Sequence, residues 1–399
     1  MSLIKLWKSN SEAIEDYSIE QIVSMSGDGK LKDNNDCSKE LRDYLSQIPS
    51  TKLSEYIEYC LSSAFPKSGF VLQDLVNELG RRLDYKVTNG LYKGVQNKVG
   101  YDGIWSAPES NFILIEVKTT DAYRLSLDNL VNYKKSLQNT STVTDNTSIL
   151  IVVGREDTGE LEAQVRGSRH AWDIRLISAD ALMRLIALKE SSEEVETAQK
   201  IRSILVPLEY TKLDEMVDVM FTTAKDVESY TEGHLVEVSA DENENSERQW
   251  QFTPAKLLSS KRDQIVSKFS KKTDVNFIKK SRALYWSSDN KIRIATTISK
   301  RYASTSEKSY WYAYHPIWDD FLKGGTSSHF ILGCMDLDIA FSIPFDIIHS
   351  NLDNLNTTTR QGNKRMYWHI KIRIEEGSYF LLLPKASTTL NLNEYLFKL

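Results

Sequence analysis

The chain has 399 residues, of which 41% are hydrophobic and 26% charged, a balance typical of a folded chain with two or three domains. Its net charge of −5 excludes a general attraction to nucleic acid, so any polyanion binding requires a local basic patch. No stretch approaches the roughly 20 apolar residues of a membrane span, and the N-terminus lacks a signal-peptide pattern. The three cysteines are widely separated, which predicts a cytoplasmic protein without disulfides or a zinc site.

Residues 1–62 are predicted to form a helical N-terminal segment. Apolar residues recur at helical spacing in CSKELRDYLSQI (37–48) and in STKLSEYIEYCLSSAF (50–65). The predicted N-caps of these helices are Ser38 and either Ser50 or Thr51. This segment forms either a small helical subdomain or a cover on the domain that follows.

Residues 63–190 are predicted to form an α/β domain. The segment SGFVLQDLVNELGRRL (68–83) is predicted to be an amphipathic helix. Two short strands or hairpin arms follow, then the buried strand NFILIEVKTT (111–120), and helices and strands alternate after it. This alternation predicts a mixed central sheet flanked by helices.

Residues 191–250 are predicted to connect two domains. The segment TKLDEMVDVMFTTAKDVESY (211–230) has helically spaced apolar residues, and SADENENSERQ (239–249) has the composition of an exposed acidic linker.

Residues 251–399 are predicted to form a β-rich C-terminal domain, because strand-like runs alternate with turn residues. Residues 254–308 carry fourteen Lys or Arg against four Asp or Glu, a local balance of +10.

Two charges, Glu116 and Lys118, interrupt the end of the buried strand in the α/β domain. They share one face, because side chains alternate along a strand. A five-residue hairpin loop at residues 107–111 would place Asp102 opposite Glu116 on this face, with Cβ atoms about 4.5–5.5 Å apart. A loop one residue shorter would turn Asp102 to the other face, and a bulge at Gly103 is compatible with either register.

Two converging carboxylates repel each other unless a cation joins them. Lys118 can neutralise one of them, and Mg²⁺ typically takes one or two protein carboxylates together with waters and phosphate oxygens. Such an ion lowers the pKa of a bound water and stabilises charge on phosphorus, which is the chemistry of phosphodiester hydrolysis. The alternative is a solvated ion pair at the end of a strand.

The pattern of Asp102, a gap, and then Glu116-Val117-Lys118 after an apolar strand resembles the PD-(D/E)xK nuclease superfamily, in particular its bacterial restriction-endonuclease-like branch. Tyr101 stands where the signature has proline. The resemblance implies a restriction-endonuclease-like fold. It also implies that Asp102, Glu116 and the Val117 carbonyl bind Mg²⁺, with Mn²⁺ as a substitute, while Lys118 assists catalysis.

The resemblance further implies an acidic metal ligand from the preceding helix, for which Glu78 is the candidate. The alternative for Glu78 is a solvated glutamate at the border of the apolar stripe. Basic and amide side chains elsewhere suit contacts with DNA phosphates. The candidates are Gln164, Arg166, Arg169, Lys271, Lys272, Lys279 and Lys280. For these the alternative is an ordinary solvated face.

These observations predict a Mg²⁺-dependent DNA endonuclease whose C-terminal domain selects the target. The resemblance implies a role in restriction or anti-phage defence, with possible partner proteins of such a system. Because one such site cuts one strand, we expect a homodimer or higher homo-oligomer. The alternatives are an RNase or a DNA-repair nuclease of the same fold, or a non-catalytic module that binds nucleic acid or protein.

Overall fold

The computed structural model describes two compact units, which divide the chain into Met1–Asp226 and Val227–Leu399. The predicted connector helix (211–230) and acidic linker (239–249) lie outside the described residues. The described residues are 3–9, 14–63, 65–93, 100–119, 125–154, 159–192, 196–206, 255–303, 308–359 and 366–399.

The first unit begins with helices that share one hydrophobic core. They are α1 (Leu3–Ser9), α2 (Ile19–Met25), α3 (Asp36–Gln47), α4 (Ser50–Ser62) and α5 (Ser68–Arg82). The predicted N-cap at Ser38 is wrong, because α3 starts earlier and the Asn35 side chain accepts a hydrogen bond from the Ser38 N–H. Helix α4 likewise has Pro49 at its N-cap position instead of a serine or threonine.

A five-stranded mixed sheet follows, in the order β1-β2-β3-β4-β5. Its strands are β1 (Lys86–Asn89), β2 (Gly103–Ser106), β3 (Phe112–Lys118), β4 (Thr147–Val153) and β5 (Ile174–Ser178). The first three are antiparallel, and β3, β4 and β5 run parallel. The helices between and after them are α6 (Leu127–Asn139), α7 (Gly159–Arg166), α8 (Ala179–Ser191) and α9 (Glu196–Ile204).

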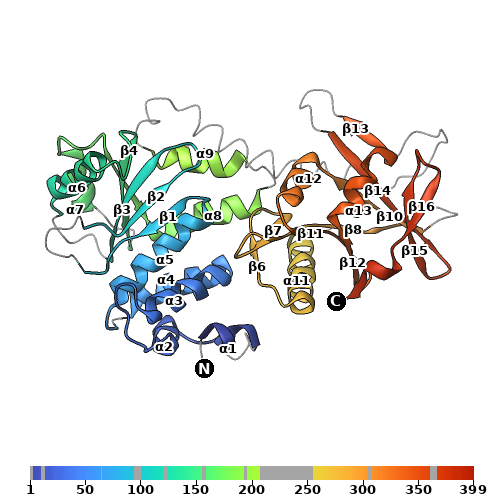
Figure 1. The fold of residues 1–399 in the computed structure, drawn as a ribbon, viewed down its shortest axis with the longest axis horizontal. Coiled ribbons are helices and arrows are strands. Elements are labelled where there is room, and N and C mark those ends of the chain that lie inside the picture. Colours follow the sequence, from blue (N-terminus) through green and yellow to red (C-terminus); the bar gives the residue numbers. More distant parts are fainter. Residues whose placement is uncertain are drawn as a thin grey trace. The chain divides into compact units, whose positions relative to one another are not determined.

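Helices cover both faces of this sheet (Figure 1). Helices α5 and α8 share a core with Ile113 and Ile115, whereas α6 and α7 pack with Leu114 on the opposite face. Every residue of β4 is buried, as expected for a central parallel strand covered on both sides. Ile201 of α9 is also buried in the core of this unit, so the described start of the predicted connector packs here. The α/β class is therefore confirmed.

The second unit contains two six-stranded sheets. One has the order β17-β12-β11-β8-β7-β6, and its strands are β6 (Phe277–Lys279), β7 (Leu284–Ser287), β8 (Ile292–Ser299), β11 (Ser327–Cys334), β12 (Ile339–Pro344) and β17 (Leu396–Lys398). The other has the order β16-β15-β14-β10-β9 with β13 beside β14, and its strands are β9 (Arg301–Ala303), β10 (Lys308–Tyr314), β13 (Thr357–Thr359), β14 (Met366–Glu375), β15 (Ser378–Leu383) and β16 (Thr388–Asn391).

The main core of the second unit lies between its two sheets. Tyr310 and Tyr312 of one sheet and Phe330 and Phe341 of the other are buried together there. The helices are α11 (Ala255–Thr273), α12 (Pro316–Lys323) and α13 (Phe345–Ser350), with short 3₁₀ turns at Leu352–Asn354 and Asn393–Tyr395. Across the described parts of both units, no helix combines the length and apolarity needed to cross a membrane.

Candidate active site

The hairpin of β2 and β3 has the register that a five-residue loop predicts. Ser106 pairs with Phe112 and Gly103 with Ile115, so Asp102 reaches the level of Glu116. The Asp102 N–H donates at 3.1 Å to the carbonyl of Ile115, the residue already paired with Gly103, so Asp102 and Gly103 both face Ile115, as in a β-bulge. The predicted register is therefore confirmed, and the shorter loop is excluded.

Asp102, Glu116 and Lys118 meet at the end of β3. Asp102 Oδ2 accepts a hydrogen bond from the Val117 N–H at 2.7 Å, and Lys118 Nζ lies 2.5 Å from Glu116 Oε1. Since the N–H and C=O of one strand residue point toward the same neighbouring strand, the Val117 carbonyl is also directed to the Asp102 side. Two carboxylates, one ammonium and one backbone carbonyl therefore share this end of the strand.

The closeness of Asp102 and Glu116 affects the pKa of Asp102. Burial, and after it the negative charge of Glu116, raise the pKa of Asp102 to about 7, whereas the Val117 N–H and the Lys118 ammonium act to lower it. The protein thus holds Asp102 where its ionised form is disfavoured. A divalent cation between the carboxylates would reverse that preference, because an adjacent positive charge favours the ionised form.

Helix α5 fixes the backbone of Asp102. The Asp102 carbonyl accepts hydrogen bonds from Gln73 Nε2 at 3.0 Å, Asn77 Nδ2 at 2.8 Å and the Gly90 N–H at 2.9 Å. Asn77 Oδ1 in turn accepts a hydrogen bond from Trp105 Nε1 at 3.1 Å. Both α5 side chains are buried, so these contacts determine where the hairpin lies.

The close approach of α5 also explains a glycine in the hairpin. A Cβ atom added at Gly103 would lie 2.1 Å from Asn77 Oδ1, far inside contact distance. Sequence reasoning missed Gln73 and Asn77. The signal was present, because two amide residues four positions apart form one polar row on a helix that is otherwise apolar toward the core.

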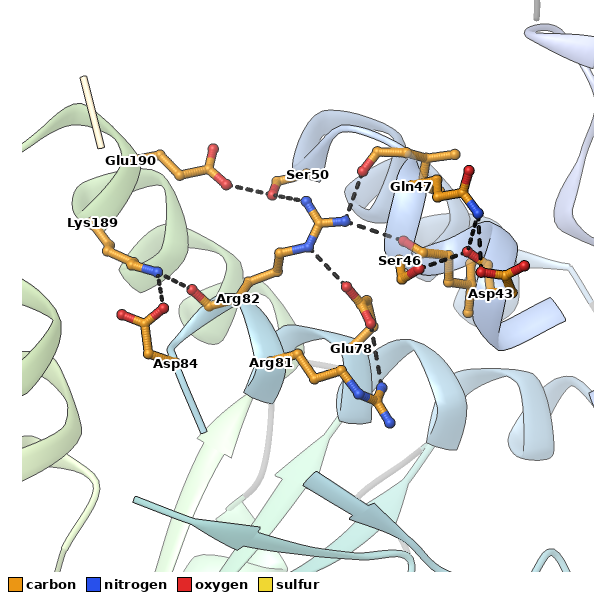
Figure 2. Close-up of polar contacts among 12 residues, drawn as sticks. Asp43, Ser46, Gln47, Ser50, Glu78, Arg81, Arg82, Asp84, Lys189 and Glu190 are labelled. Carbon is orange, nitrogen blue, oxygen red and sulfur yellow. Dashed lines mark hydrogen bonds and ion pairs between the residues drawn. The ribbon is translucent and has the colours of Figure 1, made fainter. Parts of the chain in front are cut away.

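Glu78 lies on a different face of α5, and Figure 2 shows its partners. Its Oε1 is 2.9 Å from Arg82 Nε, and its Oε2 is 3.3 Å from Arg81 Nη1. Arg82 also donates to the carbonyls of Leu45 at 3.1 Å and Ile48 at 2.8 Å, at the C-terminal end of α3. Both carboxylate oxygens of Glu78 are therefore engaged by arginines of α5 itself, and Arg82 carries the connection to α3.

This arrangement does not bring Glu78, a predicted metal ligand, to the side of Asp102. Helical geometry places Glu78 and Arg82 one turn apart on the face that meets α3, whereas Gln73 and Asn77 share the face that meets Asp102. Within the described residues, no group of three or more His, Cys, Asp or Glu side chains is arranged to hold a metal. The acidic part of the candidate site consists of Asp102 and Glu116.

The predicted DNA contacts around α7 are only partly available. Gln164 is bound to the backbone of Leu125. Its Oε1 accepts a hydrogen bond from the Leu125 N–H at 3.3 Å, and its Nε2 donates a hydrogen bond to the Leu125 carbonyl. Gln164 thus holds the residues that lead into α6, which replaces the predicted phosphate contact with a structural one. Arg166 and Arg169 are exposed, and each has a carboxylate partner, Glu162 and Asp128 respectively.

The four predicted lysines belong to the second unit. Lys271 and Lys272 are exposed at the end of α11, and Lys272 Nζ lies 5.4 Å from the ring centre of Phe397. Lys279 lies in β6, and Lys280 Nζ is 4.3 Å from the ring centre of Trp286. Two of the four ammonium groups are thus held over aromatic rings, an arrangement that stabilises a cation.

A cavity of about 490 Å³ adjoins the hairpin of the candidate site. Gly90 and Tyr101 contribute to its wall, and both are directly connected to Asp102, Gly90 by its hydrogen bond and Tyr101 by the chain. Arg42 and Asn89 add polar groups. A substrate group in this cavity would lie next to the backbone that carries Asp102.

Comparisons of the chain with protein-family models, with curated proteins and with solved structures find no match. The chemistry of the site therefore has to be inferred from its own residues.

Proposed function

We propose that the chain is a metal-dependent endonuclease that hydrolyses DNA phosphodiester bonds. The observation that carries this proposal is the convergence of Asp102 and Glu116 at the end of β3, with Lys118 bound to Glu116. An inert ion pair would need one carboxylate and one cation. The second carboxylate, that of Asp102, is buried and accepts a backbone hydrogen bond from Val117, and it adds a negative charge that one lysine does not balance.

Mg²⁺, with Mn²⁺ as a substitute, fits the chemistry of this donor set. Asp102, Glu116 and the carbonyl of Val117 would hold the ion, and waters or phosphate oxygens would complete its shell. The bound ion supplies positive charge for a phosphate and lowers the pKa of a water. The raised pKa of Asp102 supports the fit, because it reports an excess of negative charge that a cation would relieve.

Lys118 is the group that acts on the substrate in this proposal. Its side chain is 29% exposed and its contact with Glu116 fixes the position of the ammonium. From there it donates hydrogen bonds to the attacking water or to a phosphate oxygen on which negative charge develops. Asp102 and Glu116 supply the negative charge that would position the cation.

The mixed sheet with helices on both faces supports the restriction-endonuclease-like fold that the PD-(D/E)xK resemblance implies. In the proposal the second unit selects the target. Restriction or anti-phage defence is the role that the resemblance suggests, with partner proteins of such a system. Cleavage of both strands by a single-site enzyme would require a homodimer or higher oligomer.

The test compares nucleic-acid substrates with Mg²⁺ and with a chelator. The substrates are supercoiled plasmid with and without modified bases, a duplex oligonucleotide and a structured RNA. The variants are Lys118→Met and a matched control, Lys86→Met, at an exposed position on β1 of the same sheet. We expect wild type and the control to cut DNA with Mg²⁺, and the chelator or Lys118→Met to abolish cutting.

Each other outcome corrects the proposal in a defined way. Cleavage of RNA alone would replace the endodeoxyribonuclease with an RNase, and cleavage confined to nicked or branched DNA would indicate a repair nuclease. Full activity of Lys118→Met would overturn the catalytic assignment. Binding of nucleic acid without cleavage of any substrate would leave a non-catalytic module.

A further inference from the structure

The sheet β16-β15-β14-β10-β9 of the second unit has one face in the main core and one face whose described side chains are partly or fully exposed. Its inward residues Tyr310, Tyr312, Ile370 and Ile372 are buried in the main core. The described helices of this unit pack on the other sheet, α11 on β8 and β11, and α12 and α13 on β8, β11 and β12. On the outward face of β10 and β14, shown in orange and red in Figure 1, the ring of His315 at the N-cap of α12 lies 5.9 Å from the ring centre of Tyr367.

Aromatic rings form a cluster on this outward face. Tyr367 stacks on His369 with ring centres 5.3 Å apart and planes at 22°. Trp311 packs edge-on against His369 at 5.4 Å and against Tyr367 at 6.1 Å. All three are only partly buried, in contrast to the fully buried rings at alternate positions of β10.

Hydrogen bonds hold the cluster in one arrangement. Trp311 Nε1 donates to His369 Nδ1 at 3.2 Å, which requires the imidazole to be neutral with its proton on Nε2. The Nε2–H then donates to the Thr358 hydroxyl at 2.7 Å. Burial lowers the pKa of His369, which agrees with a neutral ring. The aromatic surface is therefore rigid before any ligand arrives.

Cations alternate with the rings across the strands. Lys371 is exposed and pairs directly with Trp311 in the register of β14 and β10. Arg373 pairs directly with Phe380 of β15, and its Nε lies 2.8 Å from Glu375 Oε1. Residues paired in this way project to the same face with Cβ atoms about 5 Å apart. Flat rings and cations at this spacing suit a chain of bases linked by phosphates.

We propose that this outward face binds single-stranded nucleic acid, with bases stacked on Trp311 and Tyr367 and phosphates beside Lys371 and Arg373. The inference rests on the proposed function for its choice of nucleic acid as the ligand. An apolar protein partner fits less well, because it would bury Lys371 and Arg373 away from water at the centre of the contact. A duplex also fits less well, because its bases are already stacked on one another and cannot lie on the rings.

The test measures binding separately from cleavage. Fluorescein-labelled oligothymidylate and oligouridylate of about 12 nucleotides, within the usual footprint of such surfaces, are titrated with the full chain carrying Asp102→Asn, in chelator. The face variants are Trp311→Ala, Tyr367→Ala and Lys371→Glu. Trp311→Phe keeps a ring as a check on folding, and Lys398→Glu is the control, an exposed lysine on β17 of the other sheet.

We expect each aromatic truncation to weaken binding about 5- to 100-fold, the effect of losing one stacked base, and Trp311→Phe to restore most of it. Lys371→Glu should weaken binding and reduce its salt dependence, while Lys398→Glu should leave both unchanged. The thymidylate and uridylate arms show whether DNA or RNA is preferred. Failure of the parent to bind either oligonucleotide, stronger binding to a duplex, or equal binding by the face variants would overturn the inference.

Cleavage by the wild type is measured in parallel, so that the two proposals fail separately. DNA cleavage with unaltered binding by the face variants would refute this surface and leave the nuclease assignment intact. Binding that depends on Trp311 and Lys371 without any cleavage would support the surface and refute the nuclease.

Discussion

The first unit contains two buried carboxylate clusters that differ in how their charge is balanced. At the end of β3, Asp102 and Glu116 meet with one lysine between them, and the pKa of Asp102 is raised to about 7. On the other face of α5, the single carboxylate of Glu78 lies between two arginines. The first cluster has an excess of negative charge, whereas the carboxylate of the second is matched by Arg82 and also faces Arg81. Burial of an acidic residue alone therefore does not identify a metal site.

The largest expected effect is on catalysis and comes from the unbalanced cluster. Asp102→Asn removes one negative charge from the donor set while keeping the shape of the side chain. We expect cleavage to fall at least about 10³-fold, the scale of losing a group that stabilises the transition state. The unfolding free energy of the metal-free protein should stay the same or rise at pH 8, because the disfavoured charge is gone. Wild-type cleavage by this variant would contradict the assignment.

Removing the charge of Glu78 should lower the stability of the protein and leave cleavage unchanged. Glu78→Gln leaves Arg82 buried without its carboxylate and should reduce the unfolding free energy by about 3–5 kcal/mol. Urea unfolding measures this loss, and cleavage per folded molecule should be unchanged. Replacing the pair together, as Glu78→Leu with Arg82→Met, should recover much of the stability. A Mg²⁺-dependent loss of activity in Glu78→Gln would instead return Glu78 to the metal site.

Asn77→Ala tests whether α5 positions the catalytic hairpin. The change removes one of three donors to the Asp102 carbonyl and the acceptor of the Trp105 indole. We expect kcat to fall about 10- to 100-fold, as for other supporting residues of metal sites, and the Mg²⁺ concentration for half-maximal activity to rise. That concentration is a property of the folded molecules, so loss of folded protein would leave it unchanged. An unaltered Mg²⁺ dependence would reduce Asn77 to a purely structural residue.

The effect that changes least at each step of the measurement is a pH dependence of stability. The pKa of Asp102 in the fold is higher than its value of about 3.9 in an unfolded chain, so the folded state binds the proton more tightly. Between about pH 4 and 7, this group should therefore make the metal-free protein less stable as pH rises, by at most about 1.4 kcal/mol per pH unit. Urea unfolding of wild type and Asp102→Asn in chelator isolates the contribution, which the variant should lack. A difference of the opposite sign would mean that Asp102 is stabilised as an anion.

The register of the hairpin could be predicted because it depends on local chemistry. Side-chain alternation along β3 and the length of its loop determine which residues oppose each other, and both can be read from residues 102–118. The α/β class followed in the same way, from strands and helices that alternate in the sequence.

The partners of individual polar residues could not be predicted, because they depend on contacts between distant segments. The arginine partners of Glu78 could not be predicted, because nothing near it in the sequence indicates that α3 ends beside Arg82. The spacing of Gln73 and Asn77 shows that they share one face of α5, but not that their common acceptor is the Asp102 carbonyl, 25 or more residues away. Only the packing of α5 against the β2–β3 hairpin shows that Gln73 and Asn77, and not Glu78 and Arg82, contact the backbone of the candidate site.

Calorimetric titration of Mn²⁺ into three proteins tests the central claim most directly. Mn²⁺ is used because protein sites generally bind it more tightly than Mg²⁺ while accepting the same oxygen ligands. The proteins are the wild type, Asp102→Asn and Glu78→Gln, each first shown to be folded. The account predicts that the wild type and Glu78→Gln bind the ion with similar affinity and that Asp102→Asn does not bind it. Binding that survives Asp102→Asn, or that is lost in folded Glu78→Gln, would contradict the account.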